Sequence, residues 1–121
     1  MLVRRDQIEI EVSLLDDDIR RICLSGRLDM KSALLIDPPF HAAITSGESR
    51  VLVDLAGVDF MASIGIRLLV AGAKAVSGRG GKLALCNPQP AVAKTLGITG
   101  IDTIIPIYPR VAEATSWLKE A

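Results

Sequence analysis

The junction between a buried strand and a helix, at residues 51–76, constrains the fold of this chain most. Residues 51–55 (Val-Leu-Val-Asp-Leu) are nearly all apolar, as in a central strand that is covered on both faces. After a short turn, apolar residues recur at helical spacing from Ile64 to Val76, while Arg67 and Lys74 fall on another face. This pattern predicts a layered α/β domain whose later strands are joined by helical crossovers and are largely parallel.

The other segments extend this pattern, and we interpret the chain as one domain over residues 1–121. Residues 7–14 alternate between polar and apolar side chains, and they are predicted to form a hairpin with residues 19–25. Gly26 is expected to end the second of these strands. Further strands are predicted at 82–86 and 103–108, and helices at about 37–46, 64–77, 90–97 and 110–119. The expected architecture is a mixed, mostly parallel sheet of about five strands with helices packed on it.

Local signals predict which residues share a surface. Asp37-Pro38-Pro39 indicates a helix start, because aspartate caps a helix and proline is tolerated in its first turn; the double proline is expected to break any longer helix there. Asp29, Ser63 and Asn87 each follow a predicted strand, so they are expected to share the sheet edge where functional groups gather. Gly78–Gly81 precedes a strand and is expected at the opposite edge.

Composition argues against several classes of function. Lys plus Arg and Asp plus Glu each number 14, so no net charge points to nucleic acid or to an anionic membrane. No apolar run approaches the roughly 18 residues of a spanning helix, and we expect a cytoplasmic protein without membrane insertion. Cys23 and Cys86 are far apart and His41 is the single histidine. We therefore expect buried, reduced thiols, and neither a metal site nor a cofactor.

Ser63 is the main candidate for a chemical role. At the predicted start of a helix its hydroxyl can cap an unpaired backbone N–H, and spacing alone favours this structural role. A helix N-terminus also tolerates negative charge, so a phosphate on Ser63 would leave the helix intact. A catalytic serine would need a base and a Gly-x-Ser-x-Gly turn, whereas the sequence reads Met61-Ala-Ser-Ile-Gly65 and His41 lies in another segment.

Two further groups complete the candidates. Asp54 and Asp59 flank the predicted turn; Asp54 is expected to accept local backbone hydrogen bonds, and neither is expected to be catalytic. Gly78–Gly81 matches neither Gly-x-Gly-x-x-Gly nor a P-loop, and a turn is the simpler interpretation.

Two motifs give the sequence a family resemblance. The first is an aspartate at the end of a strand, a phenylalanine, and a serine and glycine that open a helix, which are here Asp54, Phe60, Ser63 and Gly65. The second is Gly-Arg-Leu-Asp at Gly26–Asp29. Together they resemble the signature of STAS domains, the anti-sigma-factor-antagonist family, over nearly the whole chain. The resemblance implies a non-enzymatic regulator that acts by partner switching.

The resemblance also implies a partner and a site. The serine that matches Ser63 in antagonist-type members is the phosphoacceptor of a partner kinase, so this chain is expected to bind an anti-sigma factor with serine kinase activity until it is phosphorylated. A free monomer without a cofactor is implied. Asp29 is expected beside the acceptor, although a helix cap is an equally good interpretation, and Arg67 could meet acidic partner groups or be solvated. The implied partner-binding residues are Asp29, Met61, Ala62, Ser63, Ile64, Gly65 and Arg67.

The sequence departs from the family pattern beside the acceptor. Many antagonists carry an aspartate where this chain has Ala62, and a serine or threonine where it has Ile64. The less polar surroundings leave open a STAS protein that docks without being phosphorylated, for example as a subunit of a lipid-transport ATPase. A small hydrolase or nucleotide-binding enzyme is the alternative from a different class.

Overall fold

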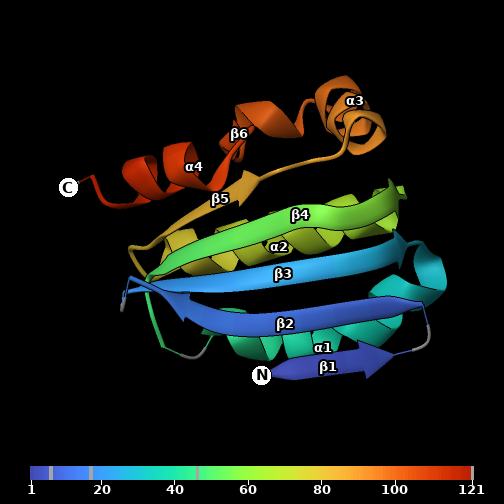
Figure 1. Ribbon diagram of the computed structural model, residues 1–121, viewed down its shortest axis with the longest axis horizontal. Coiled ribbons are helices and arrows are strands. Elements are labelled where there is room, and N and C mark those ends of the chain that lie inside the picture. Colours follow the sequence, from blue (N-terminus) through green and yellow to red (C-terminus); the bar gives the residue numbers. More distant parts are fainter. Residues whose placement is uncertain (6, 17, 46, 121) are drawn as a thin grey trace.

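The protein folds as a six-stranded sheet with helices on both faces (Figure 1). The computed structural model describes residues 1–5, 7–16, 18–45 and 47–120. The strands are β1 (Leu2–Arg5), β2 (Ile8–Leu15), β3 (Ile19–Leu28), β4 (Arg50–Met61), β5 (Lys82–Cys86) and β6 (Ile107–Tyr108). The helices are α1 (Met30–Thr45), α2 (Ser63–Gly78), α3 (Pro90–Thr99) and α4 (Val111–Leu118), with a 3-10 turn at Ile101–Thr103.

The sheet order follows the chain order, β1-β2-β3-β4-β5-β6. The first three strands pair antiparallel, and β3 to β6 pair parallel across helical connections. The predicted fold class is therefore confirmed, with one strand more than expected. The extra strand, β1, offers only four residues, too few for alternation to stand out in the sequence.

Strands β3 and β4 are longer than predicted, and this lengthening creates the site. Gly26 does not end β3: it lies within the strand at φ 114°, beside irregular pairing with β4. A Cβ at Gly26 would lie 2.0 Å from the Gln7 carbonyl oxygen, so glycine permits this close approach. β4 likewise continues past Asp54 to Met61, pairing with β3 as far as Leu28.

Helix α1 contradicts the predicted break at the double proline. It runs without interruption from Met30 to Thr45 and contains both Pro38 and Pro39. Proline has no N–H, so the carbonyls of Leu34 and Leu35 lose their usual helical donors. Buried residues on both sides of the prolines, among them Ile36 and Phe40, hold the helix against the sheet, and tertiary packing thereby overrides the local preference.

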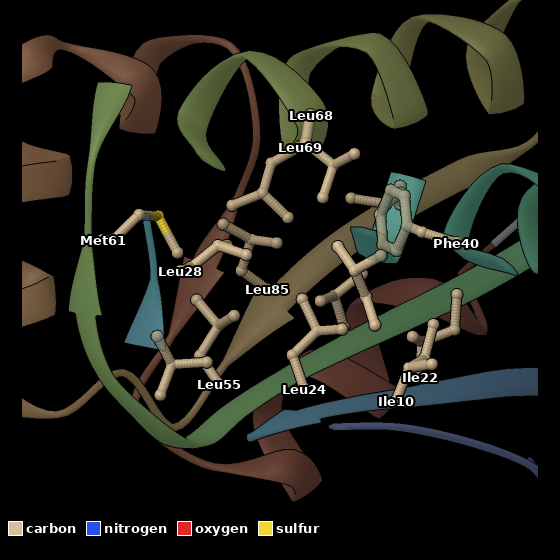
Figure 2. Packing of buried hydrophobic residues seen from close by; sticks show 14 of the residues in the cluster. Ile10, Ile22, Leu24, Leu28, Phe40, Leu55, Met61, Leu68, Leu69 and Leu85 are labelled. Carbon is tan, nitrogen blue, oxygen red and sulfur yellow. The ribbon is translucent and has the colours of Figure 1, made fainter. Parts of the chain in front are cut away.

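The core lies between the sheet and helices α1 and α2, and it is aliphatic apart from Phe40 and Met61. Figure 2 shows this cluster, with Leu24, Ile22 and Leu85 from the strands facing Leu68 and Leu69 of α2. A smaller cluster under α4 covers part of the opposite face and includes Leu52, Ala114 and Leu118. Val111 of α4 is partly buried against this cluster.

The C-terminal region differs from the prediction in one element. The strand expected at 103–108 shortens to the two residues of β6, preceded by the 3-10 turn. Pro106 and Pro109 flank β6 and cannot donate to a ladder, which confines pairing to this edge position. The predicted strand at 82–86 is confirmed, and α3 begins at Pro90 as expected.

Candidate functional site

The candidate site forms where β3 and β4 end together. Leu28 and Met61 are paired in register, and the Ala62 N–H donates to the Leu28 carbonyl oxygen at 2.9 Å. The chain then enters α1 after Asp29 and α2 at Ser63. Asp29 and Ser63, which are 34 residues apart in sequence, are therefore neighbours at one edge of the sheet, as predicted.

Asn87 does not join them. β5 ends level with Asp54, and the Asn87 side-chain amide donates to an Asp54 carboxylate oxygen at 3.3 Å. β4 extends seven residues beyond that point, so Asn87 lies part-way along β4 rather than at its end. Gly81 lies at the opposite edge, as predicted, where the following Lys82 N–H donates to the Ser49 carbonyl oxygen at 2.8 Å.

Ser63 is the first residue of α2 and not its cap. The N-cap position is held by Ala62, in an extended conformation, and no side chain caps the helix. The predicted capping role is therefore wrong, because β4 runs on to Met61 and shifts the helix start by one residue. The Ser63 side chain is exposed, and within the described part of the chain its hydroxyl forms no hydrogen bond. An accessible hydroxyl at a fixed helix start is available for modification.

Met61 and Gly65 support the site from beneath. Both are buried, and Figure 2 shows Met61 and Leu28 close together below α2. A Cβ at Gly65 would lie 2.8 Å from Leu28 Cγ and Cδ2, so glycine allows α2 to approach the end of β3. Their burial corrects the prediction that these two residues belong to a partner-binding surface: they position it and are not exposed on it.

Asp29 caps α1 through a reciprocal pair of hydrogen bonds. The Ser32 N–H donates to Asp29 Oδ1 at 3.0 Å, and the Asp29 N–H donates to Ser32 Oγ at 2.9 Å. The cap that sequence reasoning allowed is therefore present, and it starts the helix well before Asp37. The hydrogen bond from the Ser32 N–H, together with one from the Ser32 hydroxyl to Asp29 Oδ1 at 3.1 Å and the charge of Arg27, holds the pKa of Asp29 below its ordinary value. The site thus carries a carboxylate at neutral pH.

Arg27 is a site residue that sequence reasoning missed. Its Nε lies 3.3 Å from Asp29 Oδ2, and its guanidinium carbon lies 3.8 Å from the centre of the Phe60 ring. Cation–π and ionic contacts of this kind fix a long side chain. The signal was present within the Gly-Arg-Leu-Asp motif, because residues 27 and 29 fall on the same side of an extended chain.

A shallow groove of about 200 Å³ runs between α1 and α2 beside Ser63. Its lining is mainly apolar, with one charge from each helix: Ala33, Leu34, Asp37, Ile64, Arg67, Leu68 and Ala71. Met30 and Leu34 of α1 are 67% and 63% exposed. Sequence reasoning missed these two, since the expected break at the prolines hid the helical position of residues 30–36.

Asp54 lies within β4 and not at its end, and its role is structural. Its side chain is 5% exposed and is paired with Arg21 of β3, and its other oxygen accepts the Ala56 N–H at 3.0 Å. The predicted local backbone bond is confirmed. Hydrogen bonding to Asp54 raises the pKa of Arg21, so this pair ties β3 to β4 while both groups are charged.

The two cysteines flank Asp54 on neighbouring strands. Cys23 and Cys86 each pair with Asp54 in register, so two strand spacings, about 10 Å, separate them, which is too far for a disulfide. Cys86 is buried as predicted, and desolvation followed by the Asp54 charge raises its pKa to about 12. Cys23 is only partly buried, contrary to the prediction; burial still raises the pKa of its thiol.

Other kinds of site have little support among the described residues. His41 is exposed near the C-terminal end of α1. It lies about three turns from the start of α1, which is the end of that helix nearer to Ser63. No group of three or more His, Cys, Asp or Glu side chains in this part of the chain is arranged to hold a metal ion. None of the helices described is both long and apolar enough to cross a membrane.

Known proteins share this architecture. The STAS domain family model matches residues 10–114. BtrV of Bordetella bronchiseptica, whose name describes an anti-sigma factor antagonist, is 32% identical over 99 residues, covering 82% of this chain and 85% of BtrV. The crystal structure of an anti-sigma factor antagonist from Mycobacterium paratuberculosis has a TM-score of 0.85 at 24% identity, covering 93% of this chain and 95% of that one. A STAS domain protein from Planctomyces limnophilus has a TM-score of 0.80 at 30% identity, covering 92% and 98% of the two chains. This chain therefore belongs to the STAS domain family.

Proposed function

We propose that this protein is a cytoplasmic, non-enzymatic anti-sigma factor antagonist that works by partner switching. Its partner is an anti-sigma factor with serine kinase activity, which binds the surface around Ser63 and phosphorylates that serine. The observation that carries the proposal is the position of Ser63: exposed, without a hydrogen bond among the described residues, and next to both Asp29 and an apolar groove. The curated relative BtrV bears the name of this class.

The surface available to such a partner combines apolar and charged groups. Met30, Leu34 and Ile64 supply apolar area, and Asp29 and Arg67 supply charges of opposite sign. Apolar side chains surrounded by charges are typical of protein interfaces, in which the apolar part contributes affinity and the charges contribute orientation. We include Ala62 in this surface, because it is half-buried and lies between the ends of the two strands.

Phosphorylation would change this surface electrostatically. A phosphate adds about −1.5 to −2 charges at neutral pH, next to the Asp29 carboxylate and at the centre of the interface. A partner surface matched to a neutral hydroxyl would then face an anion that it must desolvate. The expected result is faster dissociation and release of the antagonist, while the helix itself tolerates the charge at its N-terminus.

The alternative within the same fold is a docking subunit that is never phosphorylated, such as one bound to a lipid-transport ATPase. The observation that favours it is the apolar pair Ala62 and Ile64 around the acceptor, which offers a kinase few polar contacts. We do not propose the enzyme alternative, because among the described residues no histidine lies near Ser63 and the neighbouring Asp29 carboxylate is engaged by Ser32 and Arg27.

The deciding experiment is intact mass spectrometry after incubation of the purified protein with ATP and lysate of its source cells. One added phosphate on wild type and on Ser77→Ala, but none on Ser63→Ala, would support the proposal. Ser77 is the matched control because it is an exposed serine at the other end of the same helix. No phosphate on any variant, with a control substrate showing an active lysate, would favour the constitutive docking subunit.

The docking surface is tested with the kinase, once it has been purified from that lysate by following this phosphorylation. Leu34→Asp is expected to weaken its binding at least tenfold, because it places a charge in the apolar groove. Ile98→Asp is the control, since Ile98 is also exposed but lies on α3. Both substitutions should change stability little at such exposed positions. Equal binding by the two variants would contradict the proposed surface.

A further inference from the structure

We infer that Arg67 is the intramolecular counter-ion of a phosphate on Ser63. The inference rests on the proposed function, since it concerns how phosphorylation of Ser63 is read out. It assigns to Arg67 a second role: in the unmodified protein it offers a cation to the partner, and in the phosphorylated protein it turns to the phosphate.

The helix places the two side chains together. Ser63 and Arg67 are four residues apart on α2, and both are exposed. Residues at this spacing are neighbours on a helix surface, with about 5–6 Å between their Cβ atoms. The anion would precede the cation along the chain, which is the favourable order for such a pair in the field of the helix dipole.

Arg67 is available for this contact, whereas the other arginine near the site is engaged. Within residues 1–5, 7–16, 18–45 and 47–120, Arg67 forms no ion pair and no hydrogen bond. Asp37 lines the same groove from α1, yet it is not within ion-pair distance of Arg67. Arg27 is already held by Asp29 at 3.3 Å and stacked on Phe60 at 3.8 Å. A phosphate on Ser63 can therefore pair with Arg67 without breaking an existing contact, whereas pairing with Arg27 would compete with Asp29 and Phe60.

The first turn of α2 favours the same placement. Ala62 provides no side-chain cap, and the N–H groups that donate to its carbonyl are those of Gly65 and Ile66. The N–H groups of Ser63 and Ile64 precede these and have no helical carbonyl to reach. Their partial positive charge faces the same end of the helix as the phosphate.

Other charged groups on neighbouring elements bear on the phosphate as well. Asp29 at the start of α1, Asp59 near the end of β4 and Asp37 on α1 oppose it, while Arg27 on β3 and Lys31 on α1 favour it. The absolute pKa of the phosphate depends on all of them. The contribution of Arg67 is therefore defined by the difference between variants of this residue, in which the other groups stay constant.

The consequence is a switch with two effects from one modification. The phosphate adds negative charge to the docking surface, and its pairing with Arg67 withdraws the positive charge that an acidic partner group would use. An antagonist without an arginine four residues after its phosphorylated serine would gain the negative charge but would not lose a positive one.

The test supplies the phosphate directly, so it needs no kinase. Protein carrying genetically encoded phosphoserine at position 63 is titrated by phosphorus NMR, which reports the second pKa of the phosphate, near 6 in the absence of neighbours. Arg67→Gln is expected to raise that pKa by about 0.3–0.5 unit, a two- to threefold change in proton affinity. Arg67→Lys should restore most of the shift, and 1 M salt should reduce it.

A matched variant makes the result decisive. Lys74→Gln removes a cation from the same helix, two turns beyond Arg67, and should leave the phosphate pKa within about 0.1 unit, the precision needed to resolve the Arg67 effect. An unchanged pKa in Arg67→Gln, or an equal shift in Lys74→Gln, would overturn the inference. Since the phosphate is installed genetically, either outcome leaves the kinase experiment with Ser63→Ala to decide the proposed function separately.

Discussion

Replacing Gly65 by alanine tests whether the close approach of α2 to β3 shapes the candidate site. A Cβ at this position would lie 2.8 Å from Leu28 Cγ and Cδ2 and 3.1 Å from Met61 Cγ. Leu28 is fully buried and cannot swing into open space. Overpacking of this kind costs about 1–3 kcal/mol, and the better helix propensity of alanine returns at most about 1 kcal/mol. The expected net loss is about 1 kcal/mol, or about 4 °C in Tm for a domain of this size.

The assay is urea unfolding followed by circular dichroism, with Gly78→Ala as the matched control. Gly78 lies at the end of the same helix and has no atom within 4 Å of a Cβ built there, so alanine should be neutral or slightly stabilising. The clash should also separate α2 from β3, and faster hydrogen exchange of the Ala62 N–H, which is bonded to Leu28, would report this directly. If Gly65→Ala were as stable as Gly78→Ala, contact with Leu28 would not be what requires glycine at this position.

Three further predictions concern the ionisable side chains of Arg21, Asp29 and Cys86. Arg21→Met should cost about 2 kcal/mol in urea unfolding, because the nearly buried Asp54 carboxylate loses its cation and keeps only the Ala56 N–H and the Asn87 amide as donors; this value is reduced because the arginine is partly exposed. A cost within error of zero would show that the ion pair contributes nothing. Because the folded pKa of Asp29 lies below its unfolded value of 3.8, its carboxylate stabilises the protein above that pH, and this contribution is lost as the pH falls through the lower, folded pKa. The stability advantage of wild type over Asp29→Asn at pH 6 should therefore shrink as the pH falls through 3.8 and below, whereas a constant difference would contradict the linkage. With a pKa raised to about 12 and no exposure, Cys86 should resist a thiol reagent at pH 8 in the native protein, so that at most Cys23 reacts before urea is added; two reactive thiols in the native state would refute this.

The general fold could be predicted because its strongest patterns are local. Alternation in residues 7–14, the apolar run at 51–55 and the helical spacing after Ile64 each reflect one element covering another. Their order along the chain restricts the topology to a mixed sheet with helical crossovers. The neighbourhood of Asp29 and Ser63 followed from the same argument, since both come after parallel strands.

The details of the site could not be predicted, because they depend on long-range packing. Pro38 and Pro39 mark a helix boundary by local preference, yet burial of Ile36 and Phe40 carries α1 through them. Residues 56–60 contain glycine and aspartate and indicate a turn, but pairing with β3 keeps them extended. That extension moves the helix start, so Ser63 becomes the first helical residue rather than the cap.

The unequal lengths of β4 and β5 determine where this domain can begin to aggregate. Beyond Asp54, β4 pairs with β3 alone, and α3 lies where a further strand segment would continue (Figure 1). The Gln89 side chain, just before α3, donates to the Ala56 carbonyl oxygen at 2.8 Å. Detachment of α3 would open this edge as a template for another extended chain, as unprotected strand edges are. Aggregation of the domain on heating should therefore begin with the release of α3 from β4, the strand that ends at Met61 beside Ser63.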